Sequence, residues 1–196
     1  MSAEPLLSII TQPAANPYSC ASDEELGSLA RKGRVEAFDE LVRRHWAGIN
    51  RFLLGYLPHG SSEDVAQEAF LRAFRKIELY EEGKPFTPWL FTIARRLALN
   101  AIRGRNRRRE VPFPDRPVEE QSPEEPLCFG PLWQFAKDRL SANAYAALRL
   151  HYAEDLPIEE VARVLDKNKI AVKVMLHRAR RRLSKFSAQL KETQTT

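Results

Sequence analysis

Hydrophobic residues recur at steps of three and four along most of the chain, which is the spacing of one face of an α-helix. Ser22 and Glu25 form a capping box that predicts the start of the first helix. A longer apolar series opens at Val35 and continues to Pro58, where a second helix is expected to end. The pattern therefore predicts helices from the start of regular structure.

Two more helices are predicted before this pattern breaks. Ser62 is expected to cap the third helix. Thr87, which a proline follows, is expected to cap a fourth helix that starts at Trp89 and ends at Gly104. Aromatic residues at the start of a helix are more often core than surface residues, so we expect Phe86 and Trp89 to pack in the core.

The regular pattern disappears over 111–131, a stretch that holds six of the chain's thirteen prolines and is typical of a linker. Beyond it, shorter apolar segments lead to a long helix from Lys169, with Asn168 as its N-cap. Two helices joined by a short turn predict a helix-turn-helix, although an αα-hairpin with no role in DNA binding has the same period.

The sequence therefore predicts an all-α protein of two small helical domains joined by a flexible linker. The expected divisions are a disordered tail over 1–21, a first domain over 22–110, the linker over 111–131, a helix-turn-helix domain over 132–190 and a tail over 191–196.

Composition narrows the class of protein. The 196 residues are 43% hydrophobic, but no apolar run approaches the ~20 residues that a membrane span needs, so we expect a soluble, cytoplasmic protein without membrane insertion. Cys20 and Cys128 are expected to be free thiols. The four histidines are scattered and no catalytic motif is present, so no enzyme, metal, cofactor or small-molecule substrate is expected.

The net charge of +5 is concentrated in two blocks. Residues 95–109 carry seven arginines and no acid, and residues 167–185 carry eight lysines or arginines and no acid. An acidic connector lies between them. Two separate basic blocks indicate a polyanion that is held at two places.

Polar faces occur on two of the predicted helices. On the third helix, Asp64, Gln67, Glu68 and Leu71 share a face at i, i+3, i+4 and i+7, which suits a protein partner or an ordinary solvent face equally. On the fourth helix, a polar ridge opposite the apolar stripe has the spacing to follow a phosphate backbone or to meet base edges, with a plain solvated face as the alternative. The ridge consists of Thr92, Arg96, Asn100 and Arg103.

Four segments, in order, resemble the bacterial sigma factors of the extracytoplasmic-function (ECF) type. They read "AFDELVRRHWAGINRFLLGYL", "EDVAQEAFLRAFRKI", "FTPWLFTIARRLALNAIRGRNRR" and "LHYAEDLPIEEVARVLDKNKIAVKVMLHRARRRL". The resemblance implies a subunit that binds core RNA polymerase, recognises a two-part promoter and helps to open it. It also implies promoter DNA and an anti-sigma factor as partners.

The resemblance further implies residue roles. The polymerase would be bound by Asp64, Gln67, Glu68, Leu71 and Phe74. The −10 element would be bound by Thr92, Arg95, Arg96, Asn100, Arg103, Arg105, Arg107 and Arg108. The −35 element would be bound by Asn168, Lys169, Ala171, Val172, Lys173, Met175, His177, Arg178 and Arg181.

The chain departs from the family pattern in both DNA-binding segments. Arg96 and Asn100 stand where the family often has Asn and Asp, which affects the choice of −10 sequence. Around the recognition helix, the family's small polar run is replaced at Asp166, Ile170, Ala171, Val174 and Met175. Direct readout at −35 would then depend on thymine methyls, Lys173, Arg178 and backbone contacts, so we predict an unusual or relaxed −35 preference. Asp166 in place of Gly costs some stability if the turn needs positive φ, although Asp tolerates positive φ better than most residues.

Three alternatives stay open on the sequence. An autonomous helix-turn-helix regulator would bind DNA tightly without polymerase. A sigma-shaped interaction protein would no longer recognise promoters, and Val174 and Met175 are the residues that favour this alternative. An RNA-binding module would need exposed aromatic platforms, and the sequence identifies none.

Overall fold

The computed structural model describes residues 17–109 and 130–193, and these residues form an all-α fold. The first domain contains α1 (Asp23–Arg31), α2 (Val35–Leu53), α3 (His59–Arg75), the short 3-10 helix η1 (Ile77–Leu79) and α4 (Phe86–Arg109). The second contains α5 (Gly130–Arg139), α6 (Ala142–Leu148), the π-helical turn η2 (Arg149–Ala153), α7 (Ile158–Leu165) and α8 (Lys169–Thr193). The predicted fold class is confirmed. The predicted linker lies outside the described residues, except that α5 begins at Gly130.

Side-chain caps fix the helix starts that the sequence predicts best. The backbone N–H of Ser22 donates to Glu25 Oε2 at 2.8 Å, and the Ser22 hydroxyl accepts from the N–H of Glu25. The Asn168 side chain accepts from the N–H of Ala171 at 2.7 Å at the start of α8. Each cap pairs a helix-terminal N–H that otherwise lacks a partner inside the helix.

Four predicted helix limits are wrong. α2 ends at Leu53 rather than at Pro58. α3 begins at His59 after Pro58, so Ser62 lies inside the helix, where its buried hydroxyl donates to Asn50 Oδ1 at 2.9 Å. α4 begins at Phe86 rather than Trp89, and it continues through Gly104 to Arg109. The tertiary partners of Ser62 and Phe86 outweigh the local capping preference, and one glycine costs a helix only about 1 kcal/mol.

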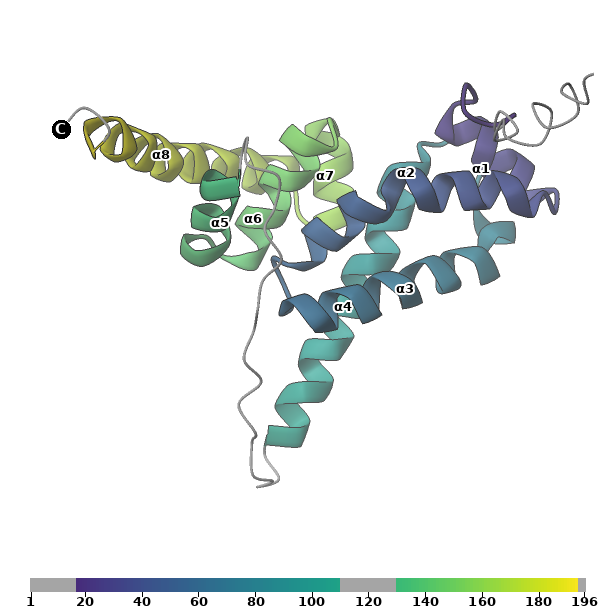
Figure 1. The fold of residues 1–196 in the computed structure, drawn as a ribbon, viewed down its shortest axis with the longest axis horizontal. Coiled ribbons are helices and arrows are strands. Elements are labelled where there is room, and N and C mark those ends of the chain that lie inside the picture. Colours follow the sequence, from purple (N-terminus) through teal and green to yellow (C-terminus); the bar gives the residue numbers. More distant parts are fainter. Residues whose placement is uncertain (1–16, 110–129, 194–196) are drawn as a thin grey trace, which may run out of the picture.

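The core of the first domain is rich in aromatic contacts. Phe52 meets Phe91 edge to face, with 5.1 Å between the ring centroids. Phe86 is fully buried and touches both Tyr80 and Trp89, which confirms the expected core role of Phe86 and Trp89. This packing holds α4 across α2 and α3, while the end of α4 projects from the rest of the molecule (Figure 1).

The second domain has the predicted helix-turn-helix. α7 ends at Leu165, and Asp166 caps it in the left-handed conformation with φ of 51°, the positive φ that a usual Gly at this position suggests. The N–H of Lys167 donates to the carbonyl of Ala162 at 2.9 Å and closes the turn. α8 then runs along the domain and away from the first domain (Figure 1).

The two domains touch each other, which the sequence does not predict. Tyr145 at the core of the second domain lies against Gly55, and its hydroxyl donates to the carbonyl of Arg51 at 3.3 Å. The Tyr56 hydroxyl donates to Asn143 Oδ1 at 3.3 Å. α7 packs directly on α4, so the apolar core continues from one domain to the other.

Candidate polymerase and promoter interface

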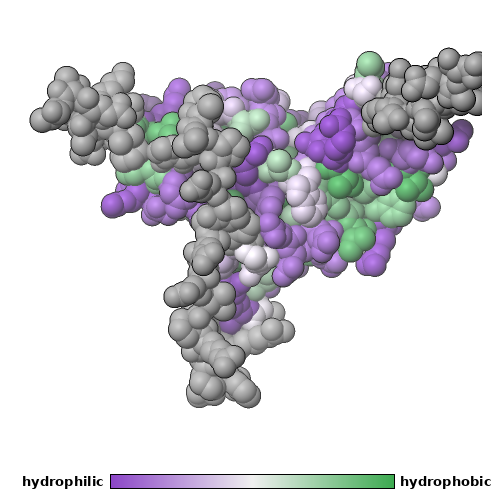
Figure 2. Space-filling model, in the orientation of Figure 1, coloured by the Kyte–Doolittle hydropathy of each residue, from purple (hydrophilic) through white to green (hydrophobic). Residues whose placement is uncertain are grey.

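The predicted polymerase-binding face of α3 is exposed and mixed in character. Asp64 and Gln67 are exposed, and Glu68 pairs with Arg72 at 2.8 Å. Leu71 is 50% exposed, and Phe74 is 41% exposed with its ring edge-on to Phe38. Figure 2 shows hydrophobic surface gathered on this side of the molecule. Exposed large apolar groups among polar ones are typical of a protein-binding surface.

The predicted −10 face of α4 lies against α7 rather than open solvent. Its residues line a crevice of about 450 Å³ between the two domains, together with Arg163, Val164 and Asp166 from the α7 side. The α4 residues in the lining are Thr92, Arg95, Arg96, Leu99, Asn100 and Arg103. α7 therefore covers part of the surface that promoter DNA would need to reach on α4.

The residues of this face differ in their hydrogen bonds and in their exposure. The Thr92 hydroxyl donates to the carbonyl of Pro88 at 2.8 Å, so it is engaged within its own helix. Arg105 donates to the Ser61 hydroxyl at 3.0 Å. Arg96, Asn100 and Arg103 are exposed into the crevice. The side chains of Arg107 and Arg108 lie outside the described residues.

Arg95 lines the crevice and buries one nitrogen of its guanidinium group. Its Nε is buried and has no hydrogen-bond partner within the described parts of the chain, and the same holds for Arg51 Nε. A buried polar atom without a partner costs about 1–3 kcal/mol.

The predicted −35 face of α8 needs two corrections. Val172 is completely buried, so it is a core residue and not a DNA contact. Met175 is half-buried against the core. Lys169 is exposed but pairs with Glu159 at 3.0 Å, and this pair lowers the pKa of Glu159. The remaining predicted side chains are exposed, apart from the half-buried Ala171, and they are Asn168, Lys173, His177, Arg178 and Arg181.

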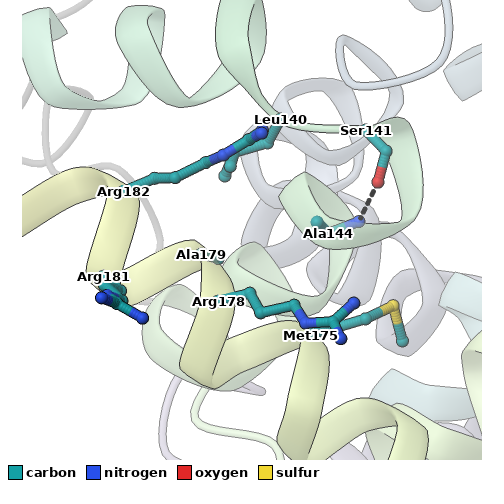
Figure 3. Close-up of a pocket in the computed structure, with 8 residues that line it drawn as sticks. All are labelled: Leu140, Ser141, Ala144, Met175, Arg178, Ala179, Arg181 and Arg182. Atoms are coloured by element: carbon teal, nitrogen blue, oxygen red, sulfur yellow. Dashed lines mark hydrogen bonds between the residues drawn. The ribbon is translucent and has the colours of Figure 1, made fainter.

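Arginines border a pocket of about 450 Å³ beside this face (Figure 3). Its floor is apolar and comes from Leu140, Ala144, Met175 and Ala179. Its rim carries Arg178, Arg181 and Arg182, and Arg182 donates to the carbonyl of Arg139 at 2.9 Å, which fixes α8 to the end of α5. Arg178 and Arg181 are exposed, so their guanidinium groups can contact an anionic partner such as DNA phosphate.

Comparison with known proteins gives this geometry a family. Residues 41–108 match sigma-70 region 2, and residues 134–183 match sigma-70 region 4. The chain is 32% identical over 188 residues to the ECF RNA polymerase sigma factor SigE of Mycolicibacterium smegmatis, which covers 91% of this chain and 71% of that protein. It is 33% identical over 185 residues to BldN of Streptomyces coelicolor, an ECF sigma factor, which covers 89% and 69%.

The chain belongs to the ECF sigma factors of the sigma-70 family.

Solved structures share the fold of this sigma factor. One is the sigma factor RpoE in complex with the anti-sigma factor NepR from Bartonella quintana, with a TM-score of 0.63 and 24% identity over 76% of this chain and 94% of that one. Another is CnrH in complex with the cytosolic domain of CnrY, with a TM-score of 0.60 and 22% identity over 85% and 97%. At these identities the likeness concerns the fold alone.

Sequence reasoning missed an ionic cluster at the start of the sigma factor's first domain. The Glu40 side chain is fully buried and accepts hydrogen bonds from Arg43 and Arg44, which lower the pKa of Glu40 to about 2. Arg44 also donates to Asp23 and to the carbonyls of residues 18, 19 and 21. The predicted tail over 1–21 is therefore fixed at its last residues, and the cluster has no signal beyond the i, i+3, i+4 spacing of its members on α2.

The boundary between the domains holds a second group that the sequence does not reveal. The Glu154 carboxylate faces Gly48 of α2, where a side chain would sit only 2.8 Å from Oε1. Burial raises the pKa of Glu154, against the opposing attraction of Arg149. Gly48 lies within α2 and Gly55 lies two residues beyond its end, and these two glycines are the only sequence signal that another segment approaches closely here.

Within residues 17–109 and 130–193, none of the helices has an apolar stretch of the length that a transmembrane segment requires. Within the same residues, no three His, Cys, Asp or Glu side chains gather where a metal ion could be held. Cys20 is exposed and free, and Cys128 lies outside the described residues.

Proposed function

We propose that this sigma factor binds core RNA polymerase through the exposed face of α3 and directs it to promoters that α4 and α8 contact at −10 and −35. The observation that carries the proposal is that both sigma-70 regions occur in order, that the α3 face and most predicted α8 side chains are exposed, and that arginines of α4 line the crevice beside α7. The sigma factor has no catalytic step of its own in this proposal, and it acts in the cytoplasm together with the polymerase.

Contact at −10 requires α7 to leave α4. In the structure α7 packs on α4, which we call the closed arrangement, and the crevice residues Arg96, Asn100 and Arg103 face α7. DNA and α7 therefore compete for one surface of α4. Core polymerase that binds the two domains at separate places would supply the free energy of opening. The free chain should consequently bind promoter DNA weakly, which distinguishes it from an autonomous regulator.

The α3 face is tested by a matched pair of substitutions. Leu71→Ser removes an exposed apolar side chain from the face, and Leu79→Ser removes one that is 73% exposed on η1, outside it. We expect Leu71→Ser to reduce both co-elution with core polymerase and run-off transcription from a genomic promoter library, and Leu79→Ser to change neither. Equal effects of the two substitutions would count against the face, and no initiation by the unsubstituted chain would count against the function.

The −10 role is tested by salt dependence. Each phosphate neutralised contributes about 0.9 to the slope of log affinity against log salt. Arg103→Ala should therefore reduce the slope for holoenzyme on promoter DNA by about 0.9, with no change in polymerase binding.

An anti-sigma factor is the expected regulator, because the related RpoE is solved with one. Such a partner would act by covering the α3 face. Its presence should reduce the amount of this sigma factor that co-elutes with core polymerase.

A further inference from the structure

The first two turns of α8 expose two aliphatic side chains. Ile170 is 74% exposed and Val174 is 40% exposed. Both are β-branched, so each holds one stiff side-chain conformation in a helix. They are separated by four residues and therefore lie on one face.

This face is the one opposite the core of the domain. At about 100° per residue, Val174 lies about 40° from Ile170 around the helix. The buried residues Val172, Leu176 and Ala179 point about 180–240° away from Ile170. The second helix of a helix-turn-helix places this outer face in the major groove, with its N-terminal residues at the base edges. Ile170 and Val174 thus occupy the middle of that face.

The surroundings indicate an anionic occupant with an apolar group. Lys173 and His177 share the face, and Arg178 borders it. Residues 167–185 carry no acid. The major groove combines phosphates at its edges with one apolar group on its floor, the C5-methyl of thymine, which Ala and Phe side chains and the Thr methyl are known to contact.

We propose that Ile170 and Val174 read thymine methyl groups in the −35 element. This rests on the proposed function. A separation of four residues along a helix is about 6 Å, which spans about two base-pair steps. This sigma factor accordingly prefers a −35 element with thymines about two base pairs apart.

The test uses holoenzyme reconstituted from core polymerase and the full chain. Selection from randomised duplexes first gives the preferred −35 sequence. Deoxyuridine then replaces thymine at each selected position, which removes the methyl group alone and leaves the hydrogen-bonding edges intact. We expect each critical replacement to raise the Kd about fourfold, the value for loss of one buried methyl group.

Substitutions of Ile170 and Val174 test whether these two side chains cause the discrimination between thymine and deoxyuridine. Ile170→Ser and Val174→Ser should each abolish the discrimination between thymine and deoxyuridine at one position. Val35→Ser, which changes a valine that is 49% exposed on α2, should leave the discrimination intact. Circular dichroism should show that all three variants fold, because each changed side chain is exposed.

Two results would overturn the inference. Deoxyuridine could have no effect on the Kd of the unsubstituted holoenzyme, or the effect could persist in both serine variants of α8. In each case run-off transcription by the unsubstituted holoenzyme would still stand. Absence of run-off on every template would instead reject the proposed function.

Discussion

The contact between the domains can be tested by adding one methyl group. Gly55 lies under the ring of the fully buried Tyr145, and a Cβ at this position would come within 3.1 Å of Cε1 and 3.3 Å of Cγ, and closer still to Cδ1. Ordinary contacts begin at 3.4 Å, so the ring and the second domain would have to move back from α2. Gly55→Ala is therefore expected to open the contact.

The size of this effect follows from two terms. Forcing an extra methyl into a packed contact costs about 1–3 kcal/mol. Withdrawal of Tyr145 also loses its hydrogen bond to the carbonyl of Arg51, which is worth about 1 kcal/mol. Together, about 2–4 kcal/mol corresponds to a shift of roughly 30- to 900-fold toward the open arrangement.

Small-angle X-ray scattering on the free chain measures this shift as an increase in radius of gyration. Gly60→Ala is the matched control, because nothing lies within 4 Å of a Cβ there and the change in unfolded-chain entropy is the same. Gly48→Ala should give an intermediate effect, because the Glu154 carboxylate that it meets can move. If the Gly55 and Gly60 variants have the same radius of gyration, Tyr145 does not pack on Gly55 and the closed arrangement is wrong.

Three other predictions concern stability and pH. Because burial raises the pKa of Glu154, the charged carboxylate is disfavoured when the two domains are in contact. The contact should therefore weaken as pH rises from about 4.5 through the raised pKa. Glu154→Gln should remove this pH dependence of the radius of gyration in scattering measurements. Because the pKa of Glu40 is lowered, its contribution to stability should be complete above pH 4.5 and should disappear as pH falls toward about 2. In an acid titration followed by circular dichroism, Glu40→Gln should not show this loss of stability. Gly104→Ala should raise the free energy of unfolding in urea by about 0.5–1 kcal/mol, because the glycine lies within α4 and has open space around it; a lower value would mean that the helix is not continuous there.

Much of the fold follows from local signals in the sequence. The caps at Ser22 and Asn168 and the positive φ of Asp166 depend on residues within a few positions of each other, so a reader of the sequence can find them. The start of α3 depends on Ser62 bonding to Asn50 across a turn, so the local signal misplaced it.

The faces of the candidate site were only partly predictable. Periodicity places Val172 on one stripe with Leu176 and predicts a core position, which its burial confirms, whereas its assignment to DNA binding came from the family resemblance alone and is wrong. The covering of α4 by α7 joins segments about 70 residues apart and has no periodic signal at all. Contacts at such separations are decided by shape complementarity, which a single sequence does not display.

The hold of Arg44 on residues 18, 19 and 21 has a practical consequence, because Cys20 lies between them with an exposed, free thiol. The sequence contains one other cysteine, so Cys128→Ser would leave a single attachment point for a fluorophore. Its backbone is anchored by Arg44 on region 2. A dye at this natural handle would tumble with the domain, and its anisotropy would report assembly with polymerase directly.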